Sequence, residues 1–145
     1  EELLKQIQLS PQSLRLEVTE TLLTQDKEDT FAILARLKQL GILCSLDNFG
    51  TGYSSLSCLY HFPIDILKLD LRVEHSFLEP ALLLPLVMMA KSLEIQVVAQ
   101  GIETQEQAIQ LKELGCECAQ GYFFAHPLKL EQAENLLAKK LEWEV

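Results

Sequence analysis

Five times along the chain, a short apolar run rich in β-forming residues is followed by a segment with helical periodicity. The runs, interpreted as strands, are 14–19, 42–46, 66–69, 95–99 and 117–120. The helical segments are 27–40, about 54–62, a stretch that ends near 93, 104–115 and 130–141. Such alternation predicts a parallel sheet, because each helix returns the chain to the side where the next strand starts. The fold is therefore α/β, either a barrel or an open doubly wound sheet.

Charged and amide side chains lie at or just beyond the C-terminal end of every predicted strand. They are Glu17, Glu20, Asp47, Asn48, Lys68, Asp70, Gln100, Glu103 and Gln120. In a parallel barrel the C-terminal strand ends converge on one face and build one site, whereas an open sheet collects ligands mainly at its switch point. The pattern favours a TIM-like (β/α)8 barrel. Such a barrel typically needs about 200 to 250 residues, so this chain is expected to supply only five C-terminal βα units.

Four acidic residues of this set predict a metal-dependent chemistry if they share a cleft. Carboxylates of Glu17, Asp47, Asp70 and Glu103 repel one another unless a cation offsets their charge, and such hard oxygen ligands favour Mg²⁺ or Mn²⁺ over zinc. Lys68 can stabilise charge that develops on a phosphoryl group. Together these groups suit phosphodiester cleavage assisted by a divalent metal. The alternative, that strand-end acids are solvated loop residues or helix caps, stays open.

The segment 47–55 reads Asp-Asn-Phe-Gly-Thr-Gly-Tyr-Ser-Ser. Its two glycines permit a tight turn after a strand, and Ser54 or Ser55 can cap the helix that follows. Its glycine spacing fits neither a dinucleotide-binding fingerprint nor a P-loop. Further along, Thr104 with Gln107 forms a capping-box pattern at a helix start. Tyr122 is interpreted as a packing residue.

Composition excludes several functional classes. The chain has 12 Lys and Arg against 21 Asp and Glu, a net charge of −9, which argues against binding a nucleic acid polymer. Its longest apolar run, 81–90, is about half a membrane span. Four cysteines inside apolar stretches favour a reducing cytoplasm. The start at Glu1, without Met, leads us to expect a piece of a longer protein.

Five motifs, in order, resemble those of the EAL domains, bacterial phosphodiesterases that open cyclic di-GMP to linear pGpG. They are Leu-Glu-Val-Thr-Glu at 16–20, the glycine segment at 46–55, Leu-Lys-Leu-Asp at 67–70, Ala-Gln-Gly-Ile-Glu-Thr at 99–104, and a closing motif from Gly115 through Gln120-Gly121-Tyr122 to Leu128. The resemblance covers about 14–128, within a partial EAL domain taken as residues 1–145. It implies a cytoplasmic signalling module with an upstream sensory or GGDEF-type domain.

The resemblance also implies roles for individual residues. Glu17 and Asp47 would be metal ligands, with Asn48 at the position of a second metal-binding Asp. Lys68 would orient or activate the attacking water, and Asp70 would support a second metal.

Further residues are assigned in the same way. Glu103 and Gln120 would contact substrate or hold the site in shape. Glu20 would hold the glycine loop, which in this family couples dimerisation to the active site. The residues of that loop are Phe49, Gly50, Thr51, Gly52, Tyr53 and Ser54.

Departures from the family pattern predict weakened catalysis. The Glu-Ala-Leu motif, whose Glu is a metal ligand, does not occur in the chain, nor does the ligating Asn expected before Glu17. Asn48 replaces an Asp, so the site loses a negative charge and its affinity for Mg²⁺ or Mn²⁺ is expected to be weakened or lost. Gln100 replaces a Glu proposed as general base or metal support, and an amide cannot accept the proton. Residues 71–73 also differ from the usual Arg-Ser-Phe.

Two hypotheses follow. The first is a degenerate EAL domain that does not hydrolyse cyclic di-GMP and acts as a regulatory, nucleotide-binding or protein-interaction module. The second is an active phosphodiesterase whose missing ligands lie upstream or in a partner chain. Because five strands cannot close an eight-stranded barrel, we also predict self-association through an open sheet edge or through residues 50–55 and the following helix.

Overall fold

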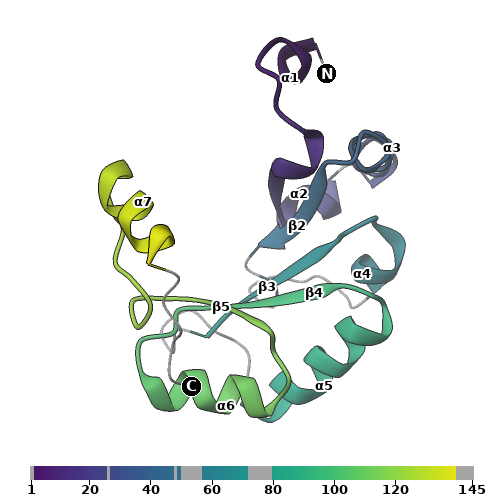
Figure 1. The fold of residues 1–145 in the computed structure, drawn as a ribbon. Helices are drawn as coiled ribbons and strands as arrows, with labels where there is room; N and C mark the ends of the chain where they lie inside the picture. Colours follow the sequence, from purple (N-terminus) through teal and green to yellow (C-terminus); the bar gives the residue numbers. More distant parts are fainter. Residues whose placement is uncertain (1, 26, 48, 50–56, 72–79, 140–145) are drawn as a thin grey trace.

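The core of the molecule is a five-stranded parallel sheet (Figure 1). The structure, a computed structural model, describes residues 2–25, 27–47, 49, 57–71 and 80–139. The strands are β1 (Arg15–Thr19), β2 (Leu43–Asp47), β3 (Ile66–Asp70), β4 (Gln96–Gln100) and β5 (Cys118–Gln120). Their order in the sheet is their order in the chain, and every pairing is parallel. This order is the one that a (β/α)8 barrel requires, since a doubly wound sheet reverses its order part-way.

Helices cover one face of the sheet. The helices that follow the first four strands are α3 (Lys27–Gln39), α4 (Ser57–His61), α5 (Pro80–Ser92) and α6 (Gln105–Glu113). In Figure 1 they form an arc along the outer side of the strands, and α7 (Leu130–Ala138) lies apart from that arc. The arrangement is that of a partial barrel wall with its helices outside.

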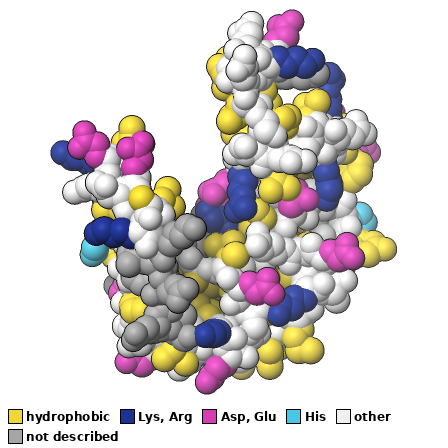
Figure 2. Space-filling view, viewed as in Figure 1, with side chains coloured by type: hydrophobic (Ala, Val, Ile, Leu, Met, Phe, Trp, Pro, Cys, Tyr) yellow, Lys and Arg dark blue, Asp and Glu magenta, His cyan; other side chains and the backbone are white. Residues whose placement is uncertain are grey.

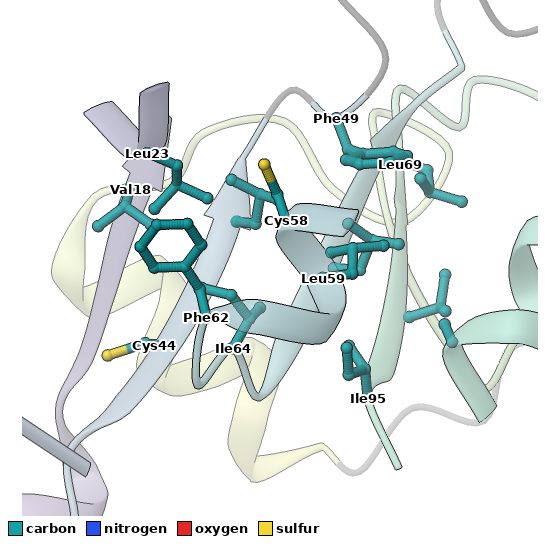
Figure 3. Close-up of a cluster of buried hydrophobic side chains, with 14 of the residues drawn as sticks. Val18, Leu23, Cys44, Phe49, Cys58, Leu59, Phe62, Ile64, Leu69 and Ile95 are labelled. Atoms are coloured by element: carbon teal, nitrogen blue, oxygen red, sulfur yellow. The ribbon is translucent and has the colours of Figure 1, made fainter. Parts of the chain in front are cut away.

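The strands separate their side chains by alternation, because successive residues point to opposite faces. The face toward the helices, here called the helix face, carries buried apolar residues. They include Val18, Cys44, Leu46, Leu67, Leu69, Val97 and Ala99. All of them except Ala99 form one cluster with Leu34 of α3, Leu59 of α4 and Val87 of α5. Figure 3 shows part of this cluster, including Val18, Leu59 and Leu69. A smaller cluster joins Ala99 to Ala108 and Leu111 of α6.

The opposite face, here called the polar face, carries the polar residues of the same strands. They are Glu17, Ser45, Asp47, Lys68, Asp70, Gln100 and Gln120. The register places Glu17 beside Ser45, Thr19 beside Asp47, and Asp70 beside Gln100. Seen from the direction of Figure 1, the surface is hollowed between α7 and the end of the molecule that carries α1 and α2, and acidic and basic side chains lie side by side along the hollow (Figure 2).

The predicted strands are confirmed, each to within one residue at either end. The capping box is confirmed as well: Thr104 Oγ1 accepts from Gln107 N at 3.3 Å, and Gln107 Oε1 accepts from Thr104 N at 3.1 Å. Gly115 ends this helix with φ +76°. The final helix ends at Ala138, with Lys139 as its cap. The predicted helix start near Ser54 lies outside the described residues.

Three short elements were not predicted: α1 (Glu2–Gln6), a 3-10 turn (Pro11–Ser13) and α2 (Glu20–Gln25). The sequence analysis places no helix between the strand at 14–19 and the helical segment that starts at residue 27, whereas the structure has α2 there. The six residues of α2 are too few to show a helical period in the sequence, although Leu23 on this helix is fully buried. Among the described residues, no helix is both long and apolar enough to cross a membrane.

Candidate functional site

Lys68 lies at the centre of the polar face. Its Nζ donates to Glu17 Oε1 at 2.6 Å and lies 3.8 Å from Asp47 Oδ1. The parallel register causes this convergence, since Glu17 on β1 and Asp47 on β2 point to the same face as Lys68 on β3. Lys68 is buried, with 9% of the residue exposed. A buried ammonium needs such partners, because leaving a charge uncompensated away from water is costly.

Gln100 on β4 completes the group. In the amide orientation that satisfies both neighbours, its oxygen accepts from Lys68 Nζ at 3.1 Å and its nitrogen donates to Asp47 Oδ1 at 3.2 Å. Four strands therefore contribute one residue each to a group that we call the Lys68 network. Its members are Glu17, Asp47, Lys68 and Gln100. Its formal charge is −1, because one ammonium faces two carboxylates and a neutral amide.

A cleft opens beside this network. It has a volume of about 530 Å³ and contains both network and loop residues. Its lining consists of Asp47, Gln100, Gly101, Glu103, Gln120, Gly121, Tyr122 and Pro127. Gly121 is required here, because a Cβ at this position would lie 1.9 Å from the backbone oxygen of Ile102. A space of this size suits a small-molecule ligand.

Tyr122 is a cleft residue that the sequence analysis missed. It was interpreted as a packing residue, but 58% of it is exposed and it lines the cleft. Its ring contacts that of His126, with the centroids 4.3 Å apart. The signal was the position of Tyr122 directly after a strand-end Gln-Gly pair, where a side chain reaches the C-terminal end of the sheet.

Other predicted site residues take different positions. Asp70 and Glu20 are buried, at 3% and 5% exposure. Phe49 is buried in the hydrophobic core, and its backbone N–H donates to the carbonyl of Lys68 at 3.3 Å. Glu103 is exposed at the cleft, and its backbone N–H donates to Gln107 Oε1. The predicted roles of Asn48, Gly50, Thr51, Gly52, Tyr53 and Ser54 fall outside the described residues.

The fit to a divalent metal can be tested on the described part of the chain. There, no three His, Cys, Asp or Glu side chains come together closely enough to hold an ion. On the polar face, the carboxylates of Glu17 and Asp47 both face the Lys68 ammonium. Within the described residues, these two carboxylates are therefore paired with the Lys68 ammonium. The ligand set that the resemblance implies stays a prediction.

All four cysteines are free. Burial raises the pKa of the Cys44 and Cys116 thiols above the ordinary value, and Asp65 adds to the effect at Cys44. Cys116 Sγ donates weakly to the carbonyls of Val97 and Cys118. A thiol with a raised pKa is a poor nucleophile, so these two residues act as small buried side chains.

Comparisons with known proteins agree with this architecture. A model of the EAL domain matches residues 1–127. The chain is 41% identical over 138 residues to the cyclic di-GMP phosphodiesterase NbdA of Pseudomonas aeruginosa, covering 92% of this chain and 18% of that protein. It thus spans less than a fifth of that relative's length.

Solved structures give the same result. The cyclic di-GMP complex of the MucR phosphodiesterase from Pseudomonas aeruginosa superposes with a TM-score of 0.81 and 35% identity, over 91% of this chain and 55% of that one. The manganese and cyclic di-GMP complex of BlrP1 from Klebsiella pneumoniae does so with a TM-score of 0.77 and 34% identity, over 87% and 33%. The match of sequence, strand order and fold over most of the chain leads to one conclusion: the chain belongs to the EAL domain family.

Proposed function

We propose that this chain is a degenerate EAL domain of a cyclic di-GMP signalling protein, which binds the dinucleotide without hydrolysing it and acts as a regulatory module. One observation carries the proposal, namely the position of the Gln100 side chain. It is hydrogen-bonded between Lys68 and Asp47, where a catalytic carboxylate is expected in the family. An amide oxygen accepts hydrogen bonds but does not take up a proton at neutral pH. The side chain at this position therefore cannot act as a general base.

The state of Lys68 supports the same proposal. An attacking water is oriented by a lysine whose donors are available to it. Two of the three Lys68 donors are already used, toward Glu17 at 2.6 Å and Gln100 at 3.1 Å, so at most one is left for a water. A weak metal site further lowers turnover, because a bound dication both lowers the pKa of water and polarises the phosphate. We infer that Mg²⁺ or Mn²⁺ binds more weakly here than in active family members.

Nucleotide binding is supported by the cleft. Its volume of about 530 Å³ and its mixed lining suit part of a dinucleotide. Glu103 and Gln120 offer hydrogen-bonding groups, and the exposed ring of Tyr122 offers a surface on which a base can stack. The MucR and BlrP1 structures are complexes with cyclic di-GMP, which makes this dinucleotide the ligand to test.

The test is a calorimetric titration with cyclic di-GMP, with and without Mg²⁺, together with an assay for linear pGpG. We expect binding under both conditions and no product. The variant Tyr122→Ala should weaken binding by about 1–3 kcal/mol, the usual contribution of a stacked base. Tyr60→Ala is the matched control, because Tyr60 is 76% exposed on α4, whose core contacts lie on the helix face. Metal-dependent release of pGpG at rates typical of the family would refute the proposal.

A second candidate is an active phosphodiesterase whose missing ligands lie upstream or in a partner chain. The convergence of Glu17, Asp47 and Lys68 favours it, because these are the residues that the family resemblance assigns to metal and water. The double variant Asn48→Asp with Gln100→Glu, in a chain extended upstream, is expected to gain turnover by restoring two carboxylates. If this variant stays inactive, the loss of charge is not what disables the site.

We also infer self-association and a partner domain. The outer strands β1 and β5 each pair with one strand only among the described residues, and such edges favour further pairing. Light scattering that shows a stable monomer at high concentration would count against self-association. MucR is named a bifunctional diguanylate cyclase and phosphodiesterase, which supports an associated GGDEF-type domain. A cytoplasmic location is consistent with four free cysteines.

A further inference from the structure

We propose that Lys68 is an internal counter-cation that competes with divalent metal ions for Glu17 and Asp47, and that Gln100 holds it in place. This inference rests on the proposed function, since it concerns how the same site satisfies its charge. It identifies Gln100 as a residue that sets the preference of the site for an ammonium over a dication.

The geometry around Nζ is the first argument. Lys68 Nζ faces three oxygens that come from three other strands: Glu17 Oε1 at 2.6 Å, Asp47 Oδ1 at 3.8 Å and Gln100 Oε1 at 3.1 Å. An ammonium has three donors and no acceptor, so an environment of oxygens alone suits it. The side chain is only 11% exposed, which limits the alternative positions it can take in water.

The second argument concerns competition between cations. A dication that bound Glu17 and Asp47 would lie within a few ångströms of the Lys68 ammonium. Charges of the same sign at that distance repel, and the repulsion is greatest on the buried Lys68 and Asp47 side of the site, since the Glu17 side chain is 52% exposed to water. The ion must therefore displace Lys68 from both carboxylates or bind without them. Either way, the observed ion pairs reduce metal affinity.

The third argument is the chemistry of Gln100. A glutamine can accept from an ammonium and donate to a carboxylate at the same time, and the position of Gln100 allows both, toward Lys68 at 3.1 Å and Asp47 at 3.2 Å, in the amide orientation given above. A glutamate in its place would accept from Lys68 but would repel Asp47. It would also raise the number of carboxylates around the site to three, a set that favours a dication. Gln100 thus stabilises the arrangement with the lysine inside.

The experiment measures Mn²⁺ binding to the 145-residue chain by electron paramagnetic resonance, without nucleotide. Lys68→Met removes the competing charge and should tighten Mn²⁺ binding about tenfold or more. Lys68→Arg keeps the charge and should bind Mn²⁺ as weakly as the parent chain. Lys38→Met is the matched control: its ammonium pairs with Asp65 Oδ1 at 2.9 Å, away from the network, so its effect should stay within about twofold.

A second variant, Gln100→Met, allows the same measurement of Mn²⁺ affinity if Lys68→Met does not fold. Gln100→Met removes the amide that holds Lys68 without changing the charge of the site. It should tighten Mn²⁺ binding by a smaller factor than Lys68→Met. The proposal is overturned if no folded variant of the two binds Mn²⁺ more tightly than the parent chain. Because no nucleotide is present, this result is independent of whether cyclic di-GMP binds, so the proposed function can fail separately.

Discussion

The two faces of the sheet are built from the same strands but are stabilised in different ways. On the helix face, residues such as Leu46, Leu67 and Leu69 are fully buried against helices. On the polar face, Lys68 is almost as buried, yet it is held by oxygens from other strands. The comparison shows that burial alone does not distinguish core from site in this domain. Core and site are distinguished by what the buried side chain contacts, which is apolar side chains in the core and oxygen atoms in the site.

The largest effect is expected on the helix face. Leu67→Ala should lower the free energy of unfolding by about 2–5 kcal/mol, because it removes buried methyl groups and leaves a cavity between sheet and helices. Urea denaturation measures this change. Leu82→Ala on α5 is the control, since Leu82 is 49% exposed and its change should stay within about 0.5 kcal/mol. Equal effects of the two variants would contradict the assignment of the core.

Gly121→Ala tests how rigidly the cleft beside the polar face is built. The added Cβ would overlap the backbone of Ile102 at 1.9 Å, so the strand end must shift, at a cost of about 1–3 kcal/mol. Cyclic di-GMP affinity should fall with stability. Gly41→Ala provides the comparison: its Cβ has space, and only its positive φ of +83° is strained, so ligand affinity should be unchanged. An unaffected cleft in Gly121→Ala would show that this backbone contact is not required.

A pH titration tests the packing of the helix face at Cys116, which borders both hydrophobic clusters. Burial raises the pKa of the Cys116 thiol above 9.0, and Cys116 packs against both hydrophobic clusters. A raised folded pKa contributes stability that is present below the unfolded pKa and is lost as pH rises through the folded one. Stability should therefore fall above pH 9. Cys116→Ala should lack this component in denaturation experiments at pH 7 to 10.

The smallest effect is expected for Ser45, which lies on the polar face but is 2% exposed. Among the described residues its Oγ has no hydrogen-bond partner. A buried hydroxyl without a partner is unfavourable, so Ser45→Ala should leave stability unchanged or raise it by up to about 1 kcal/mol. Thermal denaturation is the measurement. A clear loss of stability would show that the hydroxyl has a partner in the folded chain.

Much of the architecture could be predicted because it depends on periodicity. The strand positions, the capping box at Thr104 and the glycine helix stop at Gly115 follow from short-range rules that act within a few residues. The helix α2 could not be predicted, because six residues show no period and their helix depends on the burial of Leu23. Tyr122 was misjudged for a related reason, since aromatic residues most often pack and its sequence position does not report exposure.

The sequence by itself determined the order of strands and helices, the two faces of the sheet and the family motifs with their substitutions. Only the tertiary structure decided which polar groups pair. Lys68 and Glu17 are 51 residues apart, and Gln100 bridges two residues from strands far from it in the chain. Such partners depend on the register of parallel strands and on side-chain conformation, and neither leaves a periodic signal in the sequence. The physical reason is that the alternation of side chains along a strand fixes the face of the sheet on which a residue lies, whereas the packing of distant segments fixes which residues it contacts.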